Sequence, residues 1–193
     1  YGQADKGYMD PETGELTYQF NVPGLATGTD FSLVVTAEGY AYAWGSNQYG
    51  QVGQNQLRTK QYDVFKPVQS GSGPMDRIVS VAAGDTFALA ASQDGYVWAW
   101  GQNISGSLGL NIDTSSIGSY PTPQRVRGAD GTGYLGDERT GKVIKVFAFG
   151  NSAAALTEKG ELYVWGGNEF DRLGARRGKL NYGYPQKVPG LNH

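Results

Sequence analysis

The sequence predicts an all-β fold in which one unit of four antiparallel strands occurs three times, the layout of blades in a β-propeller. A Trp-Gly pair recurs along the chain, and a glycine precedes each pair at a nearly constant distance, which indicates a repeated structural element. The 30 glycines and 8 prolines argue against a helical bundle, whereas the 39% hydrophobic share argues against disorder. The repeat positions are Gly28, Trp44, Gly45, Gly84, Trp100, Gly101, Gly150, Trp165 and Gly166.

A hairpin forms the centre of each predicted unit. In the first unit the run FSLVVT (31–36) meets a turn at Glu38-Gly39 and continues as YAYAW (40–44), with large residues at alternate positions. Glycine supplies the positive φ that such a tight turn requires. The other two units repeat this pattern, with turns at Asp94-Gly95 and Lys159-Gly160.

Two further strands complete each predicted unit. A strand upstream of the hairpin is expected at 78–84 and 143–150, and the segment 15–25 is expected to supply one strand that completes the first unit. A fourth strand is expected near 65–70, 123–128 and 185–190, where proline suits a sheet edge. This predicts an N-terminal extension at 1–24, a first blade at 25–77, a second blade with a long insert at 78–142, and a third blade with the lead-in to another at 143–193.

The residues after each Trp-Gly pair resemble the repeat of the regulator of chromosome condensation family. The matching positions are Asn47, Gly50 and Gly53, then Asn103, Gly106, Leu108 and Gly109, and finally Asn168, Leu173 and Gly174. The resemblance implies a β-propeller, usually of seven blades. At the place where the family often has histidine, this chain is expected to have Phe31, Phe87 and Ala153, and Asp171 stands where the family prefers glycine.

Three blades are too few to close a propeller, for which four is about the lower limit. The predicted molecule is therefore an open arc with strand edges and aromatic surface at both ends, which favours association with other protein. The ends are expected to be covered by a second chain, by self-association, or by the rest of a longer polypeptide.

Charge and composition exclude several classes of partner. Sixteen basic residues stand against eighteen acidic ones, so nucleic acid is not expected as a partner. The chain has no cysteine, and no apolar run approaches the roughly 18 residues of a membrane helix. The polar start, 1–15, does not resemble a signal peptide, and an intracellular compartment is favoured over secretion, without a choice among compartments.

Motifs for catalysis or cofactor binding lack the flanking strands, helices or residues that they require. Residues 131–136 satisfy G-x-G-x-x-G, but no buried strand precedes them and no helix is predicted after them. Residues 136–142 resemble the start of a P-loop, yet Val143 stands where Ser or Thr is needed. The only histidine is His193. We therefore expect no enzyme, cofactor, metal or small-molecule substrate. The sequon at Asn103 is interpreted as a turn-forming repeat position rather than a glycan acceptor.

An interaction surface is expected in the connections, where binding residues usually lie. The longest connection, 110–142, is the expected recognition insert, and a basic stretch follows the third Trp-Gly pair. The leading interpretation is a non-catalytic scaffold subunit of a larger assembly, and the alternative is part of a guanine-nucleotide exchange factor for a small GTPase. The candidate interaction residues are Tyr120, Arg125, Arg127, Tyr134, Arg172, Arg176, Arg177 and Lys179.

Overall fold

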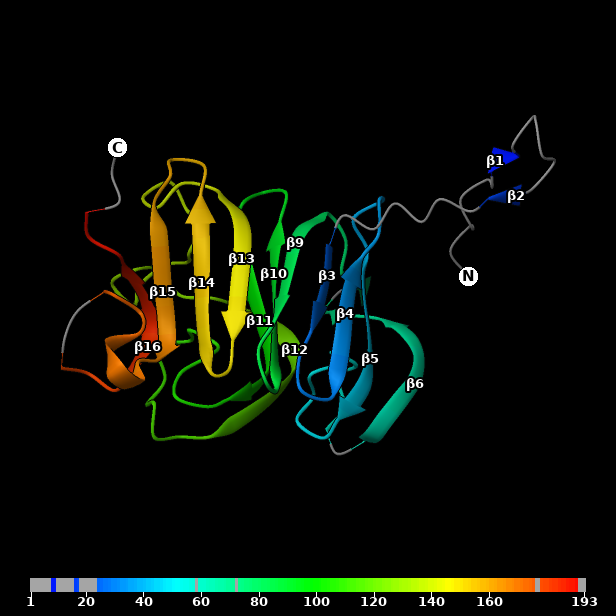
Figure 1. The fold of residues 1–193 in the computed structure, drawn as a ribbon, viewed down its shortest axis with the longest axis horizontal. Helices are drawn as coiled ribbons and strands as arrows, with labels where there is room; N and C mark the ends of the chain where they lie inside the picture. The colour runs from blue at the N-terminus through cyan, green and yellow to red at the C-terminus, as the bar shows by residue number, and fades with distance from the viewer. Residues whose placement is uncertain are drawn as a thin grey trace.

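The computed structural model is an open arc of three four-stranded antiparallel sheets, which lie side by side in chain order (Figure 1). It describes residues 8–9, 16–17, 24–57, 59–71, 73–175 and 178–190, although side chains are left undescribed at 8–9, 16–17, 59–60, 63–65 and 67. The first and third sheets do not meet, so the propeller predicted from the repeats is partial and not closed.

Each sheet is ordered from an inner strand to an outer strand. The first sheet contains β3 (Gly24–Thr27), β4 (Phe31–Val35), β5 (Ala41–Asn47) and β6 (Thr59–Pro67). The second contains β9 (Ile78–Ala83), β10 (Phe87–Ser92), β11 (Val97–Asn103) and β12 (Gly118–Arg125). The third contains β13 (Val143–Phe149), β14 (Ser152–Thr157), β15 (Leu162–Gly167) and β16 (Asn181–Lys187).

Two small sheets and one 3₁₀ turn of the described residues lie outside these sheets. The pair β1 (Tyr8–Met9) and β2 (Leu16–Thr17) forms one small sheet, and β7 (Gln69–Ser70) with β8 (Gly73–Pro74) forms another. A 3₁₀ turn, η1 (Glu169–Asp171), follows β15. The strand that completes the first sheet is β3, which overlaps only the last two residues of the segment 15–25 expected for it.

The hairpin turns have the geometry expected from their glycines. Gly95 has a φ of 98°, and its N–H donates to the carbonyl of Ser92 at 2.8 Å. A residue with a side chain would be strained at this φ. The turn places Ala91 opposite Val97 and Phe87 opposite Gly101, so the register of the hairpin follows from it.

The core lies between the sheets. All six residues of β10 are buried, because the second sheet is covered by a neighbour on both faces. Alternate residues of this strand face opposite sheets: Ala88 and Ala90 pack toward the first sheet, whereas Phe87 and Leu89 pack toward the third. Small side chains on one face let the sheets approach, and large ones on the other fill the space that remains.

The repeated tryptophans join one sheet to the next. Trp100 Nε1 donates to the carbonyl of Gln51 at 2.9 Å, and Trp165 Nε1 donates to the carbonyl of Ser107 at 2.8 Å. Both indoles are fully buried, and both carbonyls belong to the turn that leaves the preceding sheet. The equivalent Trp44 is only half-buried. The repeat Trp therefore stabilises the contact between two blades rather than one blade alone.

The repeated asparagines shape the turns that receive these indoles. The Oδ1 atoms of Asn47, Asn103 and Asn168 accept hydrogen bonds from the backbone N–H five residues later, at 3.0, 3.1 and 3.0 Å. Asn103 is 1% exposed. The interpretation of the sequon as a turn-forming position is therefore confirmed.

One expected position in the third unit is wrong by a residue. The register pairs Phe31 with Gly45, Phe87 with Gly101, and Ser152 with Gly166. Ser152, not Ala153, therefore stands at the place where the family often has histidine. The glycine that marks this unit, Gly150, lies one residue closer to its Trp-Gly pair than in the other units, which explains the shift.

Candidate functional site

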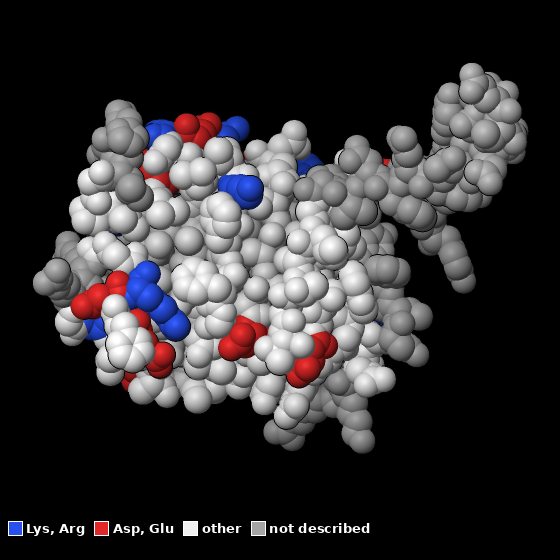
Figure 2. Space-filling model, in the orientation of Figure 1, with Lys and Arg blue, Asp and Glu red and all other residues white. Residues whose placement is uncertain are grey.

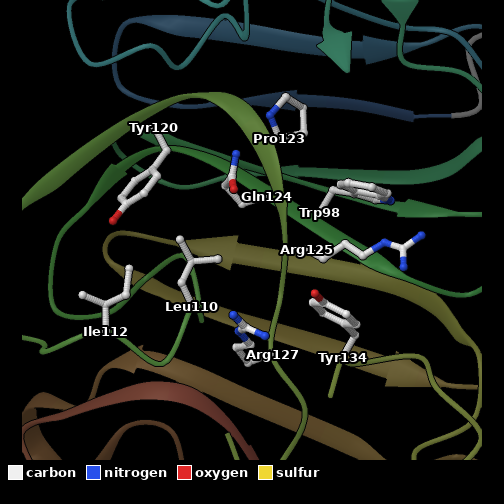
Figure 3. Close-up of a pocket in the computed structure, with 9 residues that line it drawn as sticks. All are labelled: Trp98, Leu110, Ile112, Tyr120, Pro123, Gln124, Arg125, Arg127 and Tyr134. Atoms are coloured by element: carbon white, nitrogen blue, oxygen red, sulfur yellow. The ribbon is translucent and has the colours of Figure 1, made fainter. Parts of the chain in front are cut away.

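A hollow of about 370 Å³ lies against the second sheet, beside its outer strand (Figure 3). We call it the Arg125 groove. Trp98 comes from β11, four residues come from β12, and the others come from the connections that follow these two strands. The lining residues are Trp98, Leu110, Ile112, Tyr120, Pro123, Gln124, Arg125, Arg127 and Tyr134.

Residues 126–142, the part of the predicted recognition insert that follows β12, form one wall of the groove and are held by buried backbone contacts. We call this segment the insert. Val126 N–H donates to the carbonyl of Val97 at 2.9 Å, and Leu135 N–H donates to the carbonyl of Val126 at 3.1 Å. Val126 and Leu135 are both fully buried. Arg127 and Tyr134 form a single β-bridge beside them. These contacts fix the insert on both sides of the loop between Arg127 and Tyr134, and they hold Tyr134 against the two arginines.

Aromatic rings surround the guanidinium of Arg125. Its central carbon lies 4.2 Å from the ring centre of Tyr96, 5.0 Å from that of Trp98 and 5.5 Å from that of Tyr134. The guanidinium of Arg127 lies 5.3 Å from the same Tyr134 ring. Such cation–π contacts contribute about 0.5–2 kcal/mol each, and they orient the flat guanidinium without occupying its N–H donors.

A cluster of charges closes the tip of the insert. Arg139 forms ion pairs with Asp130 at 3.1 Å and with Asp137 at 2.9 Å, and it also donates to the carbonyl of Thr132 at 3.0 Å. Hydrogen bonds from Thr132 lower the pKa of Asp130. Although burial opposes it, hydrogen bonding from Arg139 and Thr140 keeps the pKa of Asp137 below the usual carboxyl range.

The predicted interaction residues fall in two places. Tyr120, Arg125, Arg127 and Tyr134 all line the groove. Arg172 and Lys179 belong instead to the turn after the third Trp-Gly pair, where the carbonyl of Lys179 accepts from Asn168 Nδ2 at 2.7 Å. Arg176 and Arg177 lie outside the described residues.

Sequence reasoning did not single out Trp98, Leu110 or Ile112 for the groove. Trp98 carried a signal, because it is the one tryptophan of the four that does not stand at the repeat Trp-Gly position. The two aliphatic residues carried none, since nothing in a glycine-rich connection shows which side chains will face β12.

A second candidate surface is the outward face of the third sheet. In the first two sheets, the turns around Gly39 and Gly95 accept hydrogen bonds from the next sheet, from Ile78 N–H at 2.9 Å and from Val143 N–H at 3.0 Å. In the third sheet the equivalent turn holds Gly160, and a Cβ built there would meet no described atom within 4 Å.

The turns that follow β5, β11 and β15, here called the exit turns, also differ in whether the next sheet contacts them. A Cβ on Gly53 would lie 3.1 Å from Trp100 Nε1, and one on Gly109 would lie 2.9 Å from Trp165 Nε1. A Cβ on Gly174, the equivalent in the third sheet, would meet no described atom within 4 Å. The two turns that contact the next sheet in the first and second sheets are therefore also present in the third sheet. There, no further sheet of the described chain contacts them.

The inner strands form an apolar face. Exposed aliphatic or aromatic side chains occur on all three: Leu25 on β3, Val79 on β9, and Ile144, Phe147 and Phe149 on β13. Figure 2 shows that the face on which β3, β9 and β13 lie carries few charged side chains, most of them near its margins. Exposed apolar residues on three neighbouring strands make this face a candidate for contact with other protein.

The described part of the chain contains neither a metal-binding cluster nor a membrane-spanning helix. No three of its His, Cys, Asp or Glu side chains gather as a metal site would require. None of its helical segments has the length and apolarity needed to cross a bilayer.

The repeated sheets and their tryptophan contacts define a protein with the blades of a β-propeller. The repeat described as "Regulator of chromosome condensation (RCC1) repeat" matches residues 38–91 and 94–156, and a second description of that repeat matches 24–51 and 78–107. The chain belongs to the RCC1-repeat family.

Individual relatives agree with this assignment. Protein pim1 of Schizosaccharomyces pombe is 30% identical over 174 residues, which cover 87% of this chain and 30% of that protein. The X-linked retinitis pigmentosa GTPase regulator of Canis lupus familiaris is 31% identical over 168 residues, covering 85% of this chain and 15% of that protein. The chain thus spans less than a third of either relative.

Solved structures show the same architecture. Human WBSCR16 superposes with a TM-score of 0.69 at 25% identity, covering 86% of this chain and 39% of that one. Prp20p from Saccharomyces cerevisiae superposes with a TM-score of 0.66 at 19% identity, covering 96% of this chain and 44% of that one.

Proposed function

We propose that this chain is a non-catalytic protein-interaction scaffold whose third sheet binds a further blade of the same kind within a larger assembly. The observation that carries the proposal is the set of contact positions on the third sheet. Gly160 and Gly174 repeat positions that contact the next sheet elsewhere in the chain, and a Cβ built on either would meet no described atom within 4 Å. The turn carbonyl of Arg172 stands where Gln51 and Ser107 accept a tryptophan N–H.

The outward face of the third sheet is also less buried than its equivalents. Leu156 is half-buried, whereas Val35 and Ala91, which occupy the same register position in the other sheets, are fully buried against a neighbour. A blade bound there would cover Leu156, and removing apolar area from water contributes about 25 cal/mol per Å². The blade would come from a second chain, another copy, or a longer polypeptide.

The experiment is to measure the mass of the isolated chain in solution and its thermal unfolding. We expect concentration-dependent association, because exposed strand edges and apolar surface favour it. The variant Leu156→Lys should reduce association, since it places a charge on the proposed contact face. Leu180→Lys is the matched control, because Leu180 is 72% exposed and lies after the third exit turn. A monomeric chain with cooperative unfolding would contradict the proposal.

A second candidate function is a role in nucleotide exchange on a small GTPase. It is supported by the relative named a GTPase regulator, of which this chain spans 15%. The structure of Prp20p is described together with its binding properties to Gsp1p and histones, and at 19% identity this likeness extends to the fold alone. Release of a fluorescent guanine nucleotide from a GTPase, with and without this chain, separates exchange activity from a scaffold role.

A further inference from the structure

The two arginines of the Arg125 groove have no acidic partner in the described part of the chain. The ion pairs found there involve Arg77, Arg139 and Lys187, and neither Arg125 nor Arg127 takes part in one. Their guanidinium groups instead lie against aromatic rings. Stacking leaves the N–H edge of a guanidinium available, and that edge matches the two oxygens of a carboxylate.

Comparison of the blades shows that this arrangement is not a property of the repeat. Arg125 pairs in register with Trp98 on β11, and the corresponding pair in the third sheet is Lys187 with Tyr163. In the third sheet the cation is neutralised, because Lys187 Nζ lies 2.6 Å from Glu161 Oε1. In the second sheet the position equivalent to Glu161 holds Tyr96, which stacks on Arg125. The cation at this register position therefore forms an ion pair in the third sheet, whereas in the second sheet it forms none with the described residues.

The first blade has no cation at this place. Tyr42 pairs in register with Pro67 there. Tyr134, which contacts both arginines, comes from the insert between the second and third sheets. Among the three described sheets, only the second combines an aromatic residue at the hairpin position of Glu161, a cation on the outer strand and an inserted loop that carries Tyr134.

The other half of the groove is apolar. Leu110, Ile112 and Tyr120 lie together on one side of the view in Figure 3, Arg125 lies on the other with Tyr134, and Arg127 lies between the two groups. Ile112 is 37% exposed. A ligand that fits both halves carries an apolar side chain next to negative charge.

Two features favour an acidic protein segment over other ligands. Pro121 and Pro123 interrupt the backbone donors of the outer strand β12, so pairing with an added strand is not favoured. Asp130 and Asp137 lie on the same insert as Tyr134, so the positive charge of the groove is limited to Arg125 and Arg127, which suits one or two carboxylates better than the long negative backbone of a nucleic acid.

We propose that the Arg125 groove binds an acidic segment of a partner protein, with Asp or Glu carboxylates held by Arg125 and Arg127 and a neighbouring apolar side chain held by Leu110 and Ile112. This site is separate from the outward face of the third sheet. It can therefore fail while the scaffold proposal stands, and the reverse is equally true.

The test uses the full chain and a dye-labelled peptide of alternating glutamate and leucine, with fluorescence anisotropy as the readout. We expect binding that weakens as salt is added, and no binding when glutamine replaces glutamate. Arg125→Gln should weaken binding about tenfold, since a hydrogen bond to a charged group contributes about 1.5–3 kcal/mol. Arg127→Gln should weaken it as well.

Lys187→Gln is the matched control, because it removes a cation from the equivalent place in the third sheet, and it should leave binding unchanged. Thermal melting of each variant shows that it remains folded. Equal binding by the glutamine peptide, or equal loss in Lys187→Gln, would overturn the proposal. A single-stranded oligonucleotide of the same charge provides the last comparison, and tighter binding to it would assign the groove to nucleic acid instead.

Discussion

At the residue scale, the loss of stability caused by replacing a repeat tryptophan depends on whether a neighbouring sheet buries it. Trp100→Phe removes the hydrogen bond to the carbonyl of Gln51 and leaves that buried group without its indole partner. We expect a loss of about 1–3 kcal/mol in the free energy of unfolding. Trp44→Phe, at the half-buried equivalent, should cost less. Chemical denaturation measures both, and equal losses would contradict the assignment of these indoles to contacts between blades.

A second prediction at this scale concerns Glu161. Its hydrogen bonds with Lys187 and Tyr163 lower its pKa, so the ionised carboxylate stabilises the fold above the usual carboxyl range. This stabilisation is lost as the pH falls through the lowered pKa. Glu161→Gln should therefore reduce stability at neutral pH by about 1 kcal/mol or less. The difference in stability between Glu161→Gln and the unmodified chain should disappear in acid, which chemical denaturation at a series of pH values measures.

At the element scale, the insert 126–142 is held by a buried residue, Leu135, and by exposed ion pairs of Arg139. Leu135 is buried, whereas Arg139 joins Asp130 and Asp137 at the surface. Arg139→Gln should speed amide exchange at the tip of the insert and leave the melting temperature nearly unchanged, because exposed ion pairs contribute little to global stability. Hydrogen exchange measured by mass spectrometry checks this, with Glu138→Gln as the control. Unchanged amide exchange at the tip would show that the ion pairs of Arg139 do not hold the insert.

At the scale of the whole molecule, the three sheets differ in how much of each is covered. The second sheet has a neighbour on both faces, and all of β10 is buried. We expect its amides to exchange most slowly, with faster exchange in the first and third sheets, since protection follows burial and local packing. Hydrogen exchange of the isolated chain tests this order. Equal protection in all three sheets would indicate that the end sheets are also covered in solution.

Much of this molecule could be predicted from local sequence. The turn glycines, the alternating hairpins and the Trp-Gly positions predict strands within a few residues, because turn geometry and side-chain alternation act over short distances. The inner strand of the first sheet was harder to place, since β3 has only four residues and its one large apolar side chain, Leu25, is exposed rather than buried. The insert that carries Tyr134 could be identified as a recognition loop, but not its position against β12.

The all-β class and the three repeated blades follow from the amino-acid sequence, because backbone conformation and repeat spacing are local properties. Which residues act together depends on the packing of the sheets. This packing brings Arg125, from an outer strand, against Tyr96 from a hairpin and Tyr134 from an insert. It also leaves Gly174 without the described neighbour that Gly53 and Gly109 have. Contacts between residues far apart in the chain depend on how the sheets pack, and sequence spacing does not encode that packing directly.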